Sequence, residues 1–355
     1  MSWVLVSDGR RVFRDIDLSR YSRSSILPTG TLLAELAFTA TSKTRQDVIL
    51  FESSTDGRST FRMTIGAKGD LMIEHRHGPV VSYGLVKFDR PEIGDYLRIT
   101  LSWDVPSRIG LLSVENLDTG ARATKVLECP NPWSVEDIWS IFHKQENIQL
   151  DPGIAVFAVS DCVEPTGLRG GFASDTLIDT PIGPRQMTSL APGDLVQTSE
   201  HGMQPVQRVI SYEVPALGRF APVHLQAPFF GMSRDLKVAP DHRLLVTGAD
   251  AEYLFGSASV LVEARHLAKL AEPLRRAQSP TVRYVQLLLD AHVVLSTSGA
   301  WGESFYIGNL ADDQIRLATS ALSGISACDL PRHTRTATPH LHDYEAMVLL
   351  SNLSA

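Results

Sequence analysis

The first 160 residues alternate apolar and polar side chains over short runs, and this pattern most strongly constrains the fold. A period of two is typical of half-buried β-strands. Turn residues at Gly66–Asp70 and Asp118–Gly120 separate neighbouring runs, and helical periodicity in this half is confined to Trp133–Phe142. The pattern predicts an antiparallel β-sandwich. The predicted strands are Thr31–Phe38, Asp47–Ser53, Thr60–Gly66, Asp70–Arg76, Leu97–Trp103 and Ile109–Asn116.

Chain length and net charge limit the classes of protein to which this sequence can belong. A chain of 355 residues is long enough for about two domains. The net charge of −7 argues against a protein that binds nucleic acid by neutralising phosphates. No apolar run reaches the roughly 20 residues of a membrane span, and the N-terminus lacks the pattern of a signal peptide. We therefore expect either a cytoplasmic protein or one exported or assembled by a signal-independent route.

The Gly-rich segment Pro165–Gly171 interrupts the apolar pattern and marks a domain boundary. We expect a β-sandwich over residues 1–165 and a second domain over residues 166–350. In the second domain, Leu310–Ser323 has the spacing of an amphipathic helix, so a short C-terminal helix is expected there.

Three residue groups have both a functional and a structural interpretation. The cysteines are odd in number and widely spaced, so we expect buried or idle thiols and neither a disulfide framework nor a zinc site. His340 and His342 alternate on one side of a possible strand near Asp343, where they could bind a metal, although solvated histidines are commoner. Trp103 and Trp133 could stack on a sugar, but core packing is the simpler interpretation. No pattern predicts a cofactor, and no Asp-rich loop predicts bound calcium.

The second half carries several ordered sequence blocks. Gly171–Ile178 (GFASDTLI) leads into Ser189–Val196 (SLAPGDLV), and Leu236–Val246 (LKVAPDHRLLV) follows. Val260–Leu267 (VLVEARHL) and Tyr284–Leu295 (YVQLLLDAHVVL) come next. A last block, His342–Ala346 (HDYEA), closes the series. In this order the blocks resemble the Hint domain, the hedgehog/intein self-processing fold, and its bacterial subfamily in particular. The resemblance covers residues 168–350 and implies an all-β fold.

The resemblance also assigns roles to positions of this chain. In Hint domains a Cys or Ser at the position of Gly171 attacks the preceding carbonyl, which is covalent catalysis. The histidine at the position of His242 protonates the departing nitrogen, and Asp290 and His292 occupy the usual positions of the last block. Glycine has no nucleophile, and the usual threonine of the histidine block is Ala239 here. The resemblance therefore implies relic catalytic positions and a domain that does not splice.

Two residues could replace the missing nucleophile. Ser174 lies three residues after Gly171, where it does not comfortably reach the carbonyl, and Cys162 lies nine residues before it. Gly302–Glu303 occupies the place of the asparagine that ends splicing domains. Neither replacement restores the Hint arrangement.

The strand order of the first half is similar to concanavalin A-like and laminin-G-like jelly rolls. The similarity lies in Phe61–Glu74 and Leu97–Gly120. Many such domains bind sugars, so the resemblance implies a glycan or a cell-surface or assembly protein as partner, although fold alone does not establish a function. No paired carboxylates indicate a glycosidase.

Three hypotheses follow. The first is a non-catalytic binding or structural protein with a lectin-like domain and a degenerate Hint domain, part of a cell-surface or phage-like assembly. The second is an autoprocessing protease that cuts near residue 171, which the retained His242, Asp290 and His292 favour. The third is a structural protein that forms homo-oligomers through its sheet edges.

Overall fold

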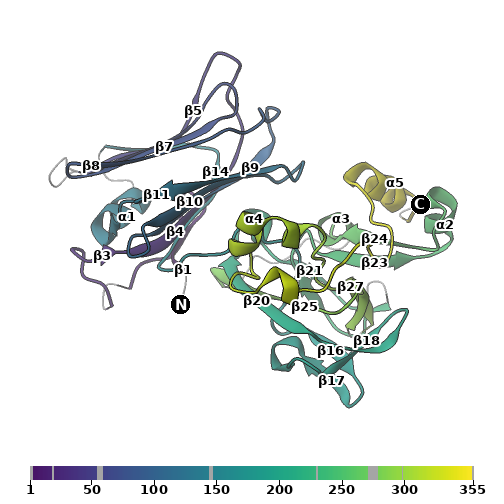
Figure 1. Cartoon of the computed structure of the whole chain (residues 1–355). Helices are drawn as coiled ribbons and strands as arrows, with labels where there is room; N and C mark the ends of the chain where they lie inside the picture. Colours follow the sequence, from purple (N-terminus) through teal and green to yellow (C-terminus); the bar gives the residue numbers. More distant parts are fainter. Residues whose placement is uncertain are drawn as a thin grey trace. The chain divides into compact units, whose positions relative to one another are not determined.

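The computed structural model describes residues 3–17, 20–53, 59–143, 147–228, 231–270, 279–297 and 299–353. It contains two compact units. The first comprises residues 1–166 with 217–219, and the second comprises residues 167–216 with 220–355. Both are built mainly of antiparallel sheets (Figure 1), which confirms the predicted mostly β fold class.

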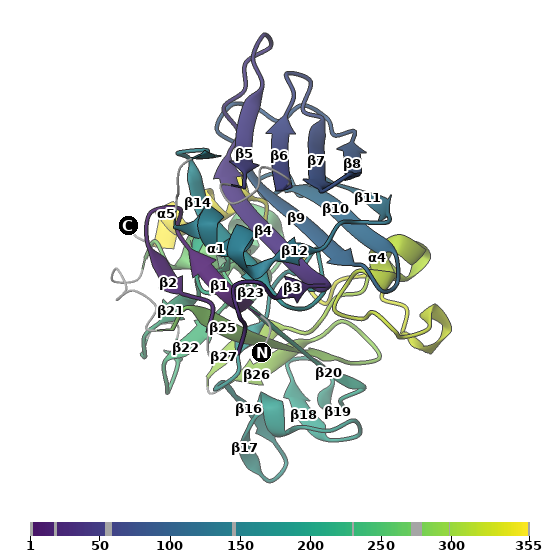
Figure 2. The ribbon, with the colours of Figure 1, turned by 90° about the vertical axis from the view of Figure 1, so that its left-hand side faces the viewer.

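The first unit is a sandwich of two antiparallel sheets (Figure 2). The seven-stranded sheet has the order β11 (Arg122–Glu128), β10 (Ile109–Asn116), β9 (Tyr96–Asp104), β4 (Thr29–Ala37), β14 (Ile154–Ser160), β1 (Trp3–Ser7) and β2 (Val12–Arg14). The five-stranded sheet has the order β13 (Ile148–Leu150), β5 (Gln46–Glu52), β6 (Ser59–Ile65), β7 (Leu71–His77) and β8 (Val80–Val86). A small ladder joins β12 (Trp133–Ser134) to β3 (Ile26–Leu27).

The inward side chains of the two sheets form one apolar core. Trp103 and Trp133 are both 1% exposed and belong to that core, so packing is their role and sugar stacking is excluded. The predicted turn between β6 and β7 is present, because the Gly66 N–H bonds the Asp70 carbonyl at 2.8 Å and Gly69 takes a φ of +95°. Sequence reasoning placed this hairpin correctly.

Helix α1 (Val135–Phe142) begins two residues later than its apolar periodicity predicted. The Ser134 hydroxyl accepts a hydrogen bond from the Asp137 N–H at 3.0 Å, which makes Ser134 the N-cap. Glu136 and Asp137 in the first turn also suit the positive end of the helix dipole. Trp133, at the start of the predicted helix, instead lies in the β12–β3 ladder.

The second unit contains two larger antiparallel sheets and a hairpin. The five-stranded sheet has the order β20 (Arg208–Pro215), β25 (Thr281–Leu288), β15 (Phe172–Ala173), β22 (Leu236–Val238) and β21 (Val223–Leu225). The six-stranded sheet has the order β19 (Gly202–Pro205), β18 (Leu195–Thr198), β26 (Val294–Thr297), β27 (Ala300–Glu303), β23 (Arg243–Thr247) and β24 (Ser259–Glu263). The hairpin pairs β16 (Leu177–Thr180) with β17 (Gly183–Gln186).

The helices of the second unit are short. They are α2 (Ala249–Phe255), α3 (Ala264–Leu267), α4 (Gln314–Ala318) and α5 (Asp343–Leu353). The continuous helix predicted over Leu310–Ser323 is wrong, because Asp313 takes an extended conformation and its carboxylate caps the Arg316 N–H at 3.0 Å. Only 310–312, as a 3-10 turn, and α4 are helical in that segment. The C-terminal helix is instead α5, which packs near α2 and α3. No described helix is long and apolar enough to cross a bilayer.

Candidate functional site

The peptide bond between Gly170 and Gly171 lies at the entrance to a central strand of the second unit. Strand β15 follows directly, and its Phe172 pairs with Val285 of β25 on one side and with Val238 of β22 on the other. Both glycines are buried. The sheet therefore fixes this peptide bond in the interior of the unit.

Two side chains bind the two polar ends of this peptide bond. The Gly171 N–H donates to Nδ1 of His242 at 3.0 Å. The Tyr212 hydroxyl donates a short hydrogen bond to the carbonyl oxygen of Gly170. We call this arrangement the peptide clamp. In chemical terms, one member lies at the nitrogen that would leave and the other at the oxygen that would gain charge during cleavage.

The residues on either side of the clamp are also held. The Gly170 N–H donates to a carboxylate oxygen of Asp241 at 3.0 Å, and the Gly171 carbonyl accepts from the Ala239 N–H at 2.8 Å. The Gln286 side-chain amide donates to the Arg169 carbonyl at 2.5 Å. The loop that carries Ala239 and His242 therefore contacts Gly171 directly, as the Hint resemblance implies.

The environment of His242 keeps its imidazole neutral. The residue is fully buried and meets the Phe172 ring edge-on, with ring centroids 4.1 Å apart. Burial lowers the pKa of His242 to about 4, and neighbouring Glu303 only partly opposes this. Because Nδ1 accepts the Gly171 N–H, the single proton of the neutral ring lies on Nε2. That atom has no hydrogen-bond partner among the described residues.

His292 joins this buried region, whereas Asp290 does not. Nδ1 of His292 accepts the Ala337 N–H at 2.9 Å, and its Nε2 lies 3.4 Å from a carboxylate oxygen of Glu303. Burial opposes ionisation of Glu303, but His292 and the nearby Arg243 outweigh it, so the pKa of Glu303 is lowered. Asp290 is exposed and accepts a hydrogen bond from the Gln207 side chain at 2.9 Å.

Gly171 has a backbone conformation that suits only glycine. Its φ is +114°, which residues with a side chain rarely adopt. A Cβ atom built there would lie 2.9 Å from Cβ of Tyr284 and 3.4 Å from the Tyr212 hydroxyl. Both the torsion and the surrounding atoms therefore exclude a simple exchange of Gly171 for cysteine.

Neither proposed replacement nucleophile belongs to the clamp. Ser174 lies beyond β15 and lines a different, polar hollow with Asp175 and Glu213. Cys162 belongs to the first unit, where partial desolvation of the thiol and a hydrogen bond to Asp161 raise its pKa to about 11. All three cysteines are exposed, so the buried alternative of the expected buried or idle thiols is wrong, and the idle alternative stays a prediction.

The suggested histidine pair does not lie on a strand. His340 makes an isolated bridge with Leu261, and helix α5 begins at Asp343. Both histidines are exposed, with ring centroids 5.7 Å apart. The strand-based metal interpretation therefore loses its geometric basis.

Within the described ranges, one group of three side chains has the spacing of metal ligands. Oxygen or nitrogen atoms of Glu263, His266 and Asp343 lie within 4.8 Å of one another. The Arg265 guanidinium already pairs with Glu263 at 2.6 Å and with Asp343 at 2.8 Å. This positive charge takes the place of a cation, so the group is an ion-pair network that joins the end of β24 and α3 to the start of α5.

Sequence reasoning missed Tyr212 and Gln286. Tyr212 lies on β20 and faces its register partner Tyr284 on β25, the strand that also carries Gln286. In the sequence, Tyr212 is one aromatic residue at an inward position of a strand, and Gln286 is one amide within an apolar strand. Ordinary core strands show the same pattern. Only the three-dimensional placement beside residues 169–171 distinguishes them.

This geometry defines a class of β domain that holds an internal peptide bond between a histidine and a hydrogen-bond donor. Residues 170–309 match the family model of the Hint domain. The second unit therefore contains a Hint domain, as the ordered sequence blocks predict. No curated protein matches the chain.

Several solved structures are similar at low identity. CBM40 of the Ruminococcus gnavus IT-sialidase, bound to α2,3-sialyllactose, is 14% identical with a TM-score of 0.25, and the match covers 37% of this chain and 62% of that one. Tailspike protein 2 of Escherichia coli O157:H7 bacteriophage CAB120 is 17% identical with a TM-score of 0.23, and the match covers 39% of this chain and 18% of that one. The LG1-3 region of the laminin α2 chain is 10% identical with a TM-score of 0.26, and the match covers 86% of this chain and 56% of that one.

The chain spans less than two thirds of each of these three structures. Their TM-scores are low, so they assign no ligand to this chain.

Proposed function

We propose that this chain is a non-catalytic binding or structural protein whose Hint domain holds its central peptide bond without cutting it. The observation that carries the proposal is the peptide clamp around a residue without a side chain. His242 and Tyr212 occupy both ends of the Gly170–Gly171 peptide, yet Gly171 has no atom that could attack the carbonyl.

The surroundings of the clamp supply no substitute nucleophile. Ser174 is three residues along an extended segment, which at roughly 3.3 Å per residue is about 10 Å away. The Tyr212 hydroxyl donates to the carbonyl oxygen and is therefore directed at the oxygen of the peptide. The thiol of Cys162, with its pKa near 11, is protonated at neutral pH and is a weak nucleophile.

The protonation state of His242 also argues against cleavage. A general acid must give a proton to the nitrogen that leaves, and that nitrogen belongs to Gly171. Nδ1 of His242 instead accepts a hydrogen bond from the Gly171 N–H, and a pKa of about 4 keeps the ring from gaining a second proton at neutral pH. The histidine acts here as a structural acceptor.

The first unit offers a surface for a partner. On edge strand β8 the alternating residues Val81, Tyr83 and Leu85 point outward and are 44%, 56% and 40% exposed. Glu74 and Arg76 of β7 are the register partners of Tyr83 and Val81. An exposed aromatic ring with a carboxylate opposite it and a guanidinium on the same neighbouring strand suits a sugar, which stacks on the ring and bonds the charged groups. We propose a glycan as the ligand of this face.

Intact mass of the full-length chain tests the first part of the proposal. We expect a single species of 38.9 kDa after incubation with and without a strong thiol. Two fragments that meet near residue 171 would overturn it. A His242→Gln variant is the matched control, because loss of any fragments in that variant would assign the cleavage to the clamp.

A glycan array with the full-length chain tests the second part. We expect binding that a Tyr83→Ser variant loses and a Tyr253→Ser variant keeps, since Tyr253 is also exposed, at 87%, but lies on α2 of the other unit. Absence of glycan binding in a protein that sediments as a concentration-dependent oligomer would instead support assembly through sheet edges.

Autoprocessing remains the second candidate function, and one observation favours it. The clamp holds the peptide bond with the hydrogen bonds that cleavage would use, at both the nitrogen and the oxygen. If cleavage occurs, its rate must fall when Tyr212 is changed to Phe. A cleavage rate that is unchanged in Tyr212→Phe would contradict a role for the clamp.

A further inference from the structure

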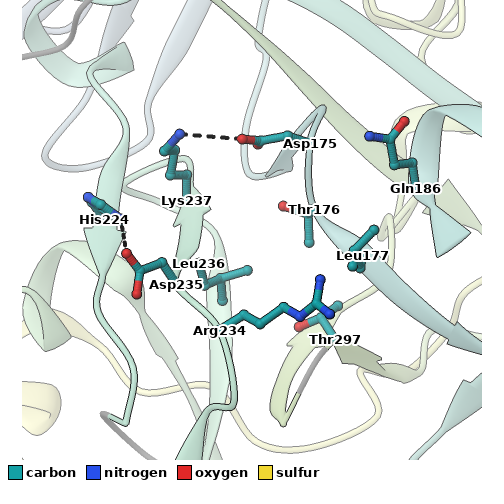
Figure 3. A pocket seen from close by; sticks show the side chains of 10 residues that line it. All are labelled: Asp175, Thr176, Leu177, Gln186, His224, Arg234, Asp235, Leu236, Lys237 and Thr297. Atoms are coloured by element: carbon teal, nitrogen blue, oxygen red, sulfur yellow. Dashed lines mark hydrogen bonds and ion pairs between the residues drawn. The ribbon is translucent and has the colours of Figure 1, made fainter. Parts of the chain in front are cut away.

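A polar pocket of about 420 Å³ opens on the Hint domain, apart from the peptide clamp (Figure 3). Its walls come from the start of β16, from β17, from β21 and from the segment that enters β22. Neither Gly170 nor Gly171 lines it. Its volume is in the range of natural small-molecule sites.

The carboxylates of the pocket are already paired. Asp175 lies 3.3 Å from the Lys237 ammonium, and Asp235 lies 3.1 Å from Nε2 of His224 (Figure 3). Asp235 also accepts the Ala227 N–H at 3.0 Å, and this hydrogen bond lowers the pKa of its carboxyl group. Both carboxylates therefore already have partners of their own.

Arg234 is the charged side chain of the pocket lining that the two ion pairs leave without a partner among the described residues. Its side chain extends across the pocket toward Thr297 and Leu177 (Figure 3), and it has no hydrogen-bond or ion-pair partner in the described part of the chain. A guanidinium presents a planar pair of N–H donors that matches a carboxylate. The two fixed carboxylates nearby disfavour a ligand with two negative charges, so a carboxylate fits better than a phosphate.

Thr176 supplies a neutral contact in the same pocket. Its backbone is fully used, because its N–H bonds the Ala173 carbonyl at 2.9 Å and its own carbonyl accepts the Met187 N–H at 3.2 Å. Its hydroxyl has no partner among the described residues and faces the pocket (Figure 3). An unpartnered hydroxyl beside a free guanidinium favours a ligand that carries both hydroxyl and carboxylate groups.

We propose that this pocket binds a sugar acid, with its carboxylate on Arg234 and a ring hydroxyl on Thr176. The volume admits a single sugar unit, and the lining is mostly polar. This inference is independent of whether the Gly170–Gly171 bond is cut, because the pocket and the clamp share no residue.

Saturation-transfer NMR and calorimetry with D-glucuronate and the full-length chain test the proposal. We expect Arg234→Gln to weaken binding about tenfold, as the loss of a charge-assisted pair would. Thr176→Val, which keeps the shape, should weaken it about threefold. Arg335→Gln is the matched control, since Arg335 is an exposed arginine of the same unit outside the pocket, and it should bind as the parent does.

Three further probes separate the chemical requirements. D-glucose lacks the carboxylate, N-acetylaspartate lacks the ring hydroxyls and glucose 6-phosphate carries a second negative charge. All three should bind more weakly than D-glucuronate. Equal binding of D-glucose, or unchanged binding by Arg234→Gln, would overturn the carboxylate assignment. N-acetylaspartate as the tightest ligand would overturn the sugar-acid assignment, and glucose 6-phosphate as the tightest would overturn the preference for one charge.

Discussion

Nδ1 of His242 accepts the backbone N–H of Gly171 at 3.0 Å, although 71 residues separate the two in sequence. In a domain that cleaves, this hydrogen bond would position the nitrogen of the scissile peptide bond. In this chain it gives the buried Gly171 N–H an acceptor. Burial lowers the pKa of this imidazole to about 4, so the ring is neutral at neutral pH. On the function proposed above, this central contact of the Hint domain has a structural role.

Gly171→Cys should not restore cleavage. A side chain there has to adopt a φ of +114° and meets Cβ of Tyr284 at 2.9 Å, so we expect about 1–3 kcal/mol of lost stability and an uncut chain. Gly171→Ala is the control, because it adds the same Cβ without a thiol. Intact mass and chemical denaturation check both variants. Efficient cleavage of Gly171→Cys, with Gly171→Ala intact, would show that the backbone adapts readily.

Tyr212→Phe should destabilise the Hint domain. It removes the only described donor to the Gly170 carbonyl, and a buried carbonyl left without a partner costs about 1–3 kcal/mol. Tyr306→Phe is the control, because Tyr306 is 38% exposed, and its change should stay within about 0.5 kcal/mol. Denaturant titration measures both, and equal effects would contradict the clamp's contribution.

Gly302→Ala should disturb the far side of His242. Its Cβ would lie 2.5 Å from Cζ of Phe172 and 2.9 Å from Nε2 of His242, an overpacking that costs about 1–3 kcal/mol. Gly66→Ala meets nothing closer than 3.6 Å and serves as the control. Hydrogen exchange of the peptide that contains Gly171 should accelerate only in Gly302→Ala. Unchanged exchange would mean that the clamp does not depend on this packing.

His75→Phe should reduce the acid sensitivity of the first unit. His75 is 4% exposed between Phe61 and Trp133, and burial lowers its pKa to about 3. Below about pH 6.5 the unfolded chain therefore binds a proton at His75 that the folded chain does not bind. The contribution of neutral His75 to the free energy of unfolding is fully present above that pH and is lost as the pH falls toward 3.

The loss amounts to about 1.4 kcal/mol per pH unit within that window. Calorimetry between pH 7 and pH 4.5 should show a shallower loss of stability in His75→Phe than in the parent. His201→Phe, at an exposed site, should leave the slope unchanged. A parent-like slope in His75→Phe would assign the acid sensitivity to other groups.

Much of the architecture could be predicted from local patterns. The alternation of apolar and polar side chains predicted Ile109–Asn116 and Leu97–Trp103, and both strands are present within one residue at each end. Both strands are buried along almost their whole length, so the polar side chains that produce the alternation are buried as well. Strands β8 and β14 were not singled out. Strand β14 is almost entirely buried, and a continuous apolar run such as IAVFAVS does not show a period of two.

The helices were harder to predict because caps override periodicity. The apolar spacing of Leu310–Ser323 suggested one helix, but the carboxylate of Asp313 competes for a backbone N–H and restarts the helix there. The site was predicted in part. Gly171 and His242 were found through ordered blocks, whereas Asp290 proved exposed and Tyr212 carried no distinguishing signal.

The backbone torsion at Gly171 also determines in which order substitutions at this site can be accommodated. Glycine and cysteine codons can differ by a single base, so loss of a thiol at such a position takes one step. The return does not, because the backbone now occupies a region that glycine alone tolerates and the Tyr284 side chain fills the space beside it. A reversal would have to move the backbone and Tyr284 before the thiol could be accommodated. Glycine at this torsion therefore separates the present backbone from one that accepts a thiol by more than a single substitution.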